Sequence, residues 1–258
     1  MGSWKNNIQI TLNLAKNDFR QKYAASSLGI VWGFIPSVAT ILIYWFVFTM
    51  AFRTASGEEP YLVWLMSGMI PWLYFQEAVI GITNSFTDYS FLVKKVVFNI
   101  ELLPYVRAVS AIVIHAFFLF LLMIVLLGYG FLPKLTYLQV IYYLFCMVCF
   151  AIALGRISAT LNVLFRDVSS LIMLILQFGV WMLPILWQPA QLSETVLAFL
   201  QLNPIFYVIV GYRDSLLHGV WFTEYIAYTA YFWLVTIVLD ILGRRLLSRL
   251  KGQFSDLM

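Results

Sequence analysis

Four ionisable side chains fall inside long apolar stretches of this sequence, where a charge is costly and suggests transport or chemistry. They are Glu77, His115, Arg156 and Asp240. Such groups could relay protons or hold an ion, but these four are scattered singly along the chain and form no cluster. We therefore expect structural roles: Glu77 near the end of its helix, Arg156 paired or reaching toward water, and His115 hydrogen-bonded across helices.

Sequence signatures of catalysis and of nucleotide binding are absent. The chain has no G-x-x-x-x-G-K-[ST] phosphate loop, no H-E-x-x-H metal motif and no nucleophile elbow. Its one C-x-x-C, Cys146 and Cys149, lies in a continuously apolar run, so we interpret it as two small residues one helical turn apart. We expect no catalytic residues, no metal site and no ATP bound by this chain.

The composition is that of an integral membrane protein. Of the 258 residues, 62% are hydrophobic and 11% are charged, against about 25% charged in an average soluble domain. The net charge of +4 comes from cations that flank apolar runs, so topology explains it better than nucleic-acid binding does. No removable signal peptide is recognisable in the first 27 residues.

Six apolar segments approach or exceed the length of about 20 residues that a membrane-spanning helix needs. The expected spans are Leu28–Phe52, Tyr61–Ile82, Leu102–Leu127, Tyr137–Leu164, Val168–Trp187 and Thr223–Leu247. We expect an all-α fold in a single permease domain, residues 1–258. Within it, residues 1–27 form a cytoplasmic interface helix, residues 28–247 the six-span membrane domain, and residues 248–258 a cytoplasmic tail.

A seventh apolar segment, Val196–Tyr212, is interrupted by Asn203 and Pro204. Lys and Arg favour the cytoplasmic side, and a seventh crossing would place the basic tail on the opposite side. We therefore expect a re-entrant or interfacial hairpin on the outer face, which a buried or cavity-lining break allows. Arg213 belongs to this outer hairpin, and both termini are expected in the cytoplasm.

Two segments outside the spans face the cytoplasm in this topology. Residues Trp4–Tyr23 place apolar side chains at helical spacing, which predicts an amphipathic helix on the membrane surface. The loop Phe91–Pro104 combines Lys94 and Lys95 with apolar residues that water alone would not stabilise. We expect a cytoplasmic partner to pack on this loop.

Aromatic residues make up 18% of the chain. Most are interpreted as lipid-facing anchors or helix packing. The alternative is that some line a pathway and offer flat apolar faces to sugar rings, and sequence alone does not choose between the two. Candidates for such a lining are Tyr44, Phe48, Phe178 and Trp181.

Short motifs occur in one order along nearly the whole chain. They are Asp18–Tyr23 followed by Ser27–Trp32, then Gly68–Trp72, Leu92–Pro104, Phe165–Asp167, Leu183–Ile185 and Asn203–Arg213. This ordered set resembles the transmembrane permease subunits of the ABC exporters of lipid-linked polysaccharides, such as O-antigen, capsule and wall teichoic acid. The loop departs from that family's pattern at Asn99 and Ile100, where proline and arginine are usual.

The resemblance implies a homodimer of permeases in the bacterial inner or plasma membrane, with two copies of a separate ATP-binding subunit that use ATP and Mg²⁺. It implies a lipid-linked polysaccharide as substrate and membrane lipids as surroundings. The loop that meets the ATPase would use Leu92, Lys94, Lys95, Phe98 and Glu101. The gate motif, where the surface helix turns into the first span, would comprise Arg20, Tyr23, Leu28, Gly29 and Trp32.

Three other functions stay open at this stage. An exporter of drugs or small lipids could share the motifs, and the aromatic content opposes it only weakly. An ion-coupled carrier would need an ion-ligand cluster or an internal repeat, and a membrane glycosyltransferase would need an acidic catalytic set on a cytoplasmic loop. None of these features is recognisable in the sequence.

Overall fold

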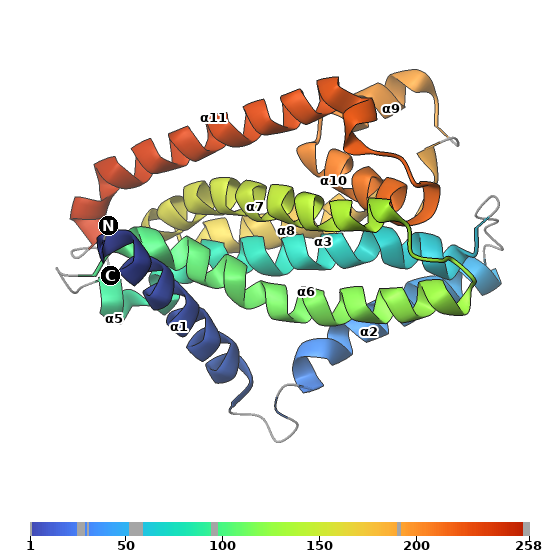
Figure 1. Ribbon diagram of the computed structural model, residues 1–258. Helices are drawn as coiled ribbons and strands as arrows, with labels where there is room; N and C mark the ends of the chain where they lie inside the picture. The colour runs from blue at the N-terminus through green and yellow to red at the C-terminus, as the bar shows by residue number, and fades with distance from the viewer. Residues whose placement is uncertain are drawn as a thin grey trace.

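The computed structural model describes residues 2–24, 29, 31–51, 59–93, 98–189 and 192–254, with side chains from residue 5 and none at 23 or 24. Within these ranges every regular element is helical. Figure 1 shows the long helices running along one bundle. The two chain ends lie close together at one end of it, and the short helices α9 and α10 lie at the other. We call these the termini end and the hairpin end.

Helix α3 (Tyr61–Thr83) forms the centre of the bundle, beside α6 (Leu103–Gly128) and α7 (Gln139–Leu164). Most of its residues are buried. Close approach of α7 depends on Gly155, because a Cβ atom there would lie 2.6 Å from the Ile82 side chain. The last long helix, α11 (Ile226–Leu250), packs along α7.

Four described helical segments are long and apolar enough to cross a membrane: Val31–Ala51, Ile100–Gly128, Leu135–Leu164 and Phe222–Gln253. The number rises to five if the bent pair at the hairpin end counts as one span. The chain is thus a multi-pass membrane protein. Three of these segments begin with short 3-10 turns, η2 (Ile100–Leu102), η3 (Leu135–Leu138) and η6 (Phe222–Tyr225), and the last ends in η7 (Lys251–Gln253).

The predicted second and fifth spans are not among these four segments. Helix α3 is long enough, but Gln76, Glu77 and several Trp and Tyr residues dilute its apolar character. Helix α8 (Asp167–Met182) has only 16 residues and stops short of the predicted Trp187. The backbone is already extended at Leu183, as expected for a residue that precedes proline.

The first two helices lie on the side of this core. Helix α1 (Gly2–Ala24) confirms the predicted N-terminal helix and packs against α6. It turns Thr11, Ala15 and Asp18 inward and leaves Leu12 53% exposed, so the buried face includes only part of the predicted apolar stripe and adds two polar residues. Helix α2 (Val31–Phe46), continued by a π-helical turn η1 (Val47–Ala51), has few buried residues.

The predicted break at Asn203 and Pro204 is confirmed. Helices α9 (Glu194–Leu200) and α10 (Pro204–Arg213) with its π-helical extension η5 (Asp214–His218) meet at 105°. The Asn203 side chain accepts a hydrogen bond from the Ile205 N–H at 3.1 Å, and Pro204 occupies the first turn of α10. Asn203 therefore acts as the N-cap of α10, and Pro204 follows at a position where the helix needs no backbone N–H donor.

Candidate functional site

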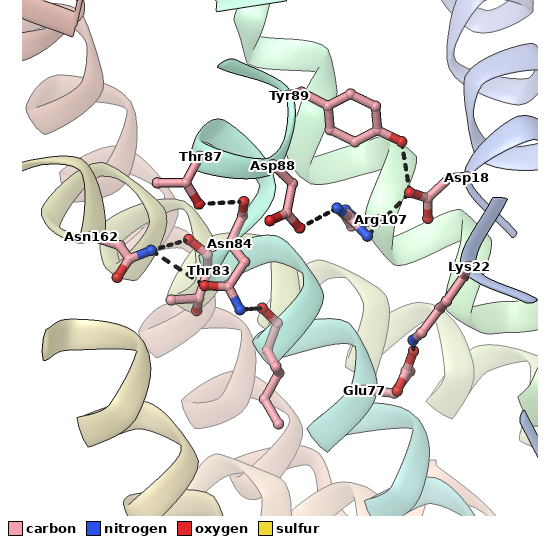
Figure 2. Close-up of polar contacts among 11 residues, drawn as sticks. Asp18, Lys22, Glu77, Thr83, Asn84, Thr87, Asp88, Tyr89, Arg107 and Asn162 are labelled. Carbon is pink, nitrogen blue, oxygen red and sulfur yellow. Dashed lines mark hydrogen bonds and ion pairs between the residues drawn. The ribbon is translucent and has the colours of Figure 1, made fainter. Parts of the chain in front are cut away.

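A buried charge cluster, Asp18–Arg107–Asp88 with Tyr89, connects three parts of the chain at the termini end (Figure 2). Asp18 comes from α1 and Arg107 from α6, while Asp88 ends α4 (Ser85–Asp88) just before α5 (Ser90–Val93). An Nη1···Oδ1 distance of 3.1 Å joins Arg107 to Asp18, and its Nη2 binds Asp88. The Tyr89 hydroxyl donates to Asp18 at 2.6 Å. We call this cluster the α1 joint.

Burial makes the α1 joint electrostatically significant. The side chains of Asp18 and Arg107 are 8% and 15% exposed, whereas Asp88 is half exposed. Solvent therefore screens the Asp18–Arg107 pair less than the Asp88–Arg107 pair. Partial burial raises the pKa of Asp88, and the Arg107 charge opposes that rise. The pKa of Tyr89 is raised by burial and then by its hydrogen bond to Asp18. The joint therefore fixes α1 to the loop that follows α3.

A second ion pair connects α1 to α3. Lys22 binds the Glu77 carboxylate (Figure 2). Both side chains are about 40% exposed, so the pair contributes little to stability compared with the α1 joint. Glu77 lies toward the termini end of its helix, as the sequence predicted, whereas its pairing with Lys22 was not predicted.

Asn162 connects the ends of α3 and α7 with the start of α8. Its Nδ2 donates to the Thr83 carbonyl and to Asn84 Oδ1, both at 3.3 Å, and its Oδ1 accepts from the Ser169 N–H at 3.0 Å. A polar hollow of about 370 Å³ lies beside this contact, and Arg166 of the Phe-Arg-Asp motif lines it.

The loop predicted to meet the ATPase is described in part. Lys94 and Lys95 lie outside the described residues. Leu92 and Phe98 are half-buried and pack against a small second core that includes Phe86, so the chain itself covers part of the loop's apolar surface. The neighbouring Phe91 remains 59% exposed.

Asn99 replaces the usual proline of this loop and has a clear local role. Its side chain accepts a hydrogen bond from the Glu101 N–H at 3.1 Å and so caps η2. Glu101 itself lies 3.7 Å from the Lys251 ammonium group of the C-terminal segment. The departure from the family pattern therefore still produces an ordered turn into α6.

The gate motif surrounds the turn from α1 into α2. Gly29 has φ +54°, a left-handed conformation that favours glycine, and its carbonyl accepts from the Trp32 N–H at 3.3 Å. Trp32 is 48% exposed, and Arg20 is exposed beside a hollow between α1 and α6. Leu28 and the Tyr23 side chain lie outside the described residues.

Three of the four candidate pathway aromatics lie together. Tyr44 is in edge contact with Phe48 and with Trp181, at ring-centroid distances of 6.5 and 6.2 Å. These contacts join α2 to α8. Phe178 is 61% exposed on α8 and has no ring contact among the described residues.

Arg213 is deeply buried at the hairpin end, although its charge alone suggested a place near the outer surface. It is 2% exposed. Its guanidinium lies 3.7 Å from the centroid of the Trp64 ring and donates to the carbonyls of Pro184, Trp64 and Ile185. Arg213 thus connects α10 with α3 and with the end of α8.

Arg156 is paired, one of its two predicted alternatives, and His115 is hydrogen-bonded across helices as predicted, whereas the pairing of Asp240 was not predicted. Arg156 of α7 binds Asp240 of α11, which also accepts from Arg244 Nε at 2.7 Å. His115 is buried on α6 and lies 3.0 Å from the Tyr212 hydroxyl of α10. None of these contacts forms a continuous chain of titratable groups between the described ends of the bundle.

Comparison with known proteins identifies the family. The model of the ABC-2 type transporter family matches residues 9–217, which is most of the chain. This range includes the α1 joint, whereas residues beyond 217 lie outside the match. This chain belongs to the ABC-2 type transporter family. Membrane subunits of ABC-2 transporters are not ATPases and pair with a separate ATP-binding subunit.

Individual ABC-2 relatives are similar over comparable lengths. An O-antigen export system permease protein RfbA from Klebsiella pneumoniae is 25% identical over 246 residues, covering 95% of this chain and 93% of the relative. A protein of the same name from Myxococcus xanthus is 24% identical over 206 residues, 79% of this chain and 78% of the relative. The likeness therefore extends over most of this chain and most of each relative.

Proposed function

We propose that this protein is the membrane subunit of an ATP-driven exporter that moves a lipid-linked polysaccharide, of the O-antigen, capsule or teichoic acid type, out of the bacterial cytoplasm. The observation that carries the proposal is the end-to-end similarity to permeases of O-antigen export, 95% of this chain against 93% of the relative. The separate ATP-binding subunit would bind ATP and Mg²⁺, and this chain would form the path for the polymer.

The proposed topology in the bacterial inner or plasma membrane has six crossings, with α3 and α8 added to the four long apolar segments. Helix α3 has 23 residues, about 34 Å at 1.5 Å per residue, which is enough for a bilayer core of about 30 Å. Its polar residues are tolerated because other helices surround it. An even number of crossings puts both termini on the same side, in keeping with their shared end of the bundle in Figure 1. The bias of Lys and Arg toward the cytoplasm would make that side the cytoplasmic one.

Helix α8 and the hairpin complete this topology. With 16 residues, α8 spans only about 24 Å, so it reaches the outer side through the extended segment that follows it. The bent pair α9 and α10 would then enter and leave the membrane from the outer face. Helix α10 is held against α3 by Arg213 at its far end, while Leu202 and Asn203 at the break itself are exposed.

The proposed mechanism couples the ATPase to the gate through the termini end. Two ATP-binding subunits would contact the loop around Lys94 and Lys95 in a homodimer of this chain. Movement of that loop would pass through the α1 joint into α1, and through the Gly29 turn into α2. The exposed faces of α2 and α8 would form the path with the second copy.

Deletion and reconstitution test this function. In a strain lacking the gene, we expect surface polysaccharide to be lost and lipid-linked polymer to accumulate in the cytoplasm. Normal surface polymer in that strain contradicts the proposal. In liposomes holding the complete complex, the lipid-linked polymer should stimulate ATP hydrolysis. Stimulation by drugs or small lipids alone would assign the protein to another branch of the family.

Copurification tests the partner contact. The double variant Lys94→Glu/Lys95→Glu should release the ATP-binding subunit, because it reverses the charge of the docking loop. The matched control, Lys134→Glu, changes a cation at the hairpin end and should keep the subunit bound. Retention of the subunit by both variants would remove the lysines from the contact.

A further inference from the structure

A cavity of about 200 Å³ lies at the hairpin end, between α7, the α9–α10 hairpin and the start of α11. Aromatic side chains dominate its lining, and one carboxylate accompanies them. The side chains used in the following argument are Tyr143, Phe206, Tyr207, Tyr225, Tyr228 and Asp214. None of these residues belongs to the α1 joint, the gate motif or the candidate pathway aromatics.

The aromatic wall of this cavity is built by close packing. A Cβ atom at Gly211 would lie 2.1 Å from the Tyr143 ring, so the glycine allows that ring to lie directly on α10. The Tyr143 and Tyr207 rings then meet at a centroid distance of 5.3 Å. The ring positions are therefore fixed by the fold and do not depend on a ligand.

Asp214 contributes a buried carboxylate that is only partly satisfied. The residue is 6% exposed. Its Oδ1 lies 2.8 Å from His218 Nδ1, while its Oδ2 is buried and has no hydrogen-bond partner among the described residues. The adjacent Arg213 donates to three backbone carbonyls of other segments. Asp214 thus places a buried carboxylate at the cavity wall, and a positively charged ligand is the chemistry that would help to balance its charge.

The hydroxyl groups around the cavity argue against a neutral polyol. Tyr228 donates to Gln201 at 2.5 Å, and Tyr207 lies 2.8 Å from the Thr229 hydroxyl. Few polar groups of the lining remain free for the several hydroxyls of a sugar, each of which would be buried without a partner. A primary ammonium group has three N–H donors, and a carboxylate together with the faces of aromatic rings can stabilise its charge.

We propose that this cavity binds a primary ammonium group, with its charge facing the Asp214 carboxylate at the cavity wall and surrounded by the tyrosine rings. The ligand is either the headgroup of an aminophospholipid or an amino sugar, since both present the same chemistry. The site goes beyond the proposed export function and does not depend on which cargo the protein carries.

Binding to the purified full-length protein in detergent tests the proposal. Ethanolamine and ethylene glycol have similar sizes and differ in charge, so saturation-transfer NMR should detect the first and not the second. Asp214→Asn should weaken ethanolamine binding about tenfold or more. The matched control Glu224→Gln, which removes a nearby exposed carboxylate, should leave binding unchanged. Equal binding of the two probes by the wild-type protein overturns the proposal, even if Asp214→Asn fails to fold.

Two further arms identify the source of the ammonium group. If the ligand is a lipid, native mass spectrometry should find phosphatidylethanolamine retained over phosphatidylglycerol, and Asp214→Asn should lose it. If the ligand is an amino sugar, glucosamine should compete with ethanolamine and glucose should not. Competition by glucose as strong as by glucosamine would show a neutral sugar site and contradict the ammonium assignment.

Discussion

Replacing Gly68 by alanine tests how firmly Arg213 is held. Gly68 lies on α3, and a Cβ atom there would be 2.5 Å from Arg213 Nη2. The end of an arginine side chain can normally move aside at little cost. Here it cannot, because the same Nη2 donates to the carbonyls of Trp64 and Ile185 at 3.2 and 3.3 Å.

The expected magnitude follows from these two hydrogen bonds. Each bond to a charged donor contributes about 1.5–3 kcal/mol, and both bonds are long, so their joint loss costs about 3 kcal/mol. Alanine in a helix interior is about 1 kcal/mol more favourable than glycine. Gly68→Ala should therefore destabilise the protein by about 2 kcal/mol, the difference between these two effects.

A double-mutant cycle isolates the contact. In an Arg213→Met background the side chain no longer donates to the carbonyls, so Gly68→Ala should become neutral or stabilising and the coupling should be about 3 kcal/mol. Unfolding in mixed micelles, followed by tryptophan fluorescence, measures the four variants. Gly128→Ala is the matched control, because no heavy atom lies within 4 Å of a Cβ there. Equal effects of Gly68→Ala in both backgrounds would refute the reasoning.

Three other substitutions test the charges and the packing. Asp18→Asn should destabilise the protein by about 1–3 kcal/mol by weakening the hold on Arg107; an unchanged melting temperature in detergent would contradict a stabilising α1 joint. Asp240→Asn should cost about 3 kcal/mol because it leaves Arg156 buried without its carboxylate, and adding Arg156→Met should recover most of the loss in the same assay. Gly155→Ala should cost about 1–3 kcal/mol through overpacking, and a wild-type chemical-unfolding midpoint would show that α3 and α7 can separate freely.

Patterns along the chain predicted the features that depend on local sequence. Apolar length located the long helices, and Asn203 with Pro204 located the bend, because a cap and a proline act within one turn. The cost of isolated charge in an apolar setting predicted that Arg156 and His115 would be partnered. The gate glycine, Gly29, also has the left-handed backbone that its residue type suggests.

Contacts between distant segments were beyond such patterns. Arg213 and Trp64 are separated by 149 positions, and the predicted topology placed the arginine only in the outer hairpin, with no partner. Asp18 begins one of the sequence motifs and Arg107 lies in the first turns of α6, but nothing in the local sequence pairs them. The end of α8 at Met182 follows from the proline after Leu183, a signal that the apolar run up to Trp187 concealed.

The weak attachment of α2 has a mechanical consequence. Only Ile41 is fully buried in this helix, whereas α3 is enclosed on several sides by its neighbours. Tilting α2 as a rigid rod disturbs few packed side chains, while parting α3 from α6 or α7 would open the core. In the proposed mechanism, a movement that reaches the turn before α2 would therefore tilt α2 as a rigid body. The packing of the rest of the protein would stay unchanged through each transport cycle.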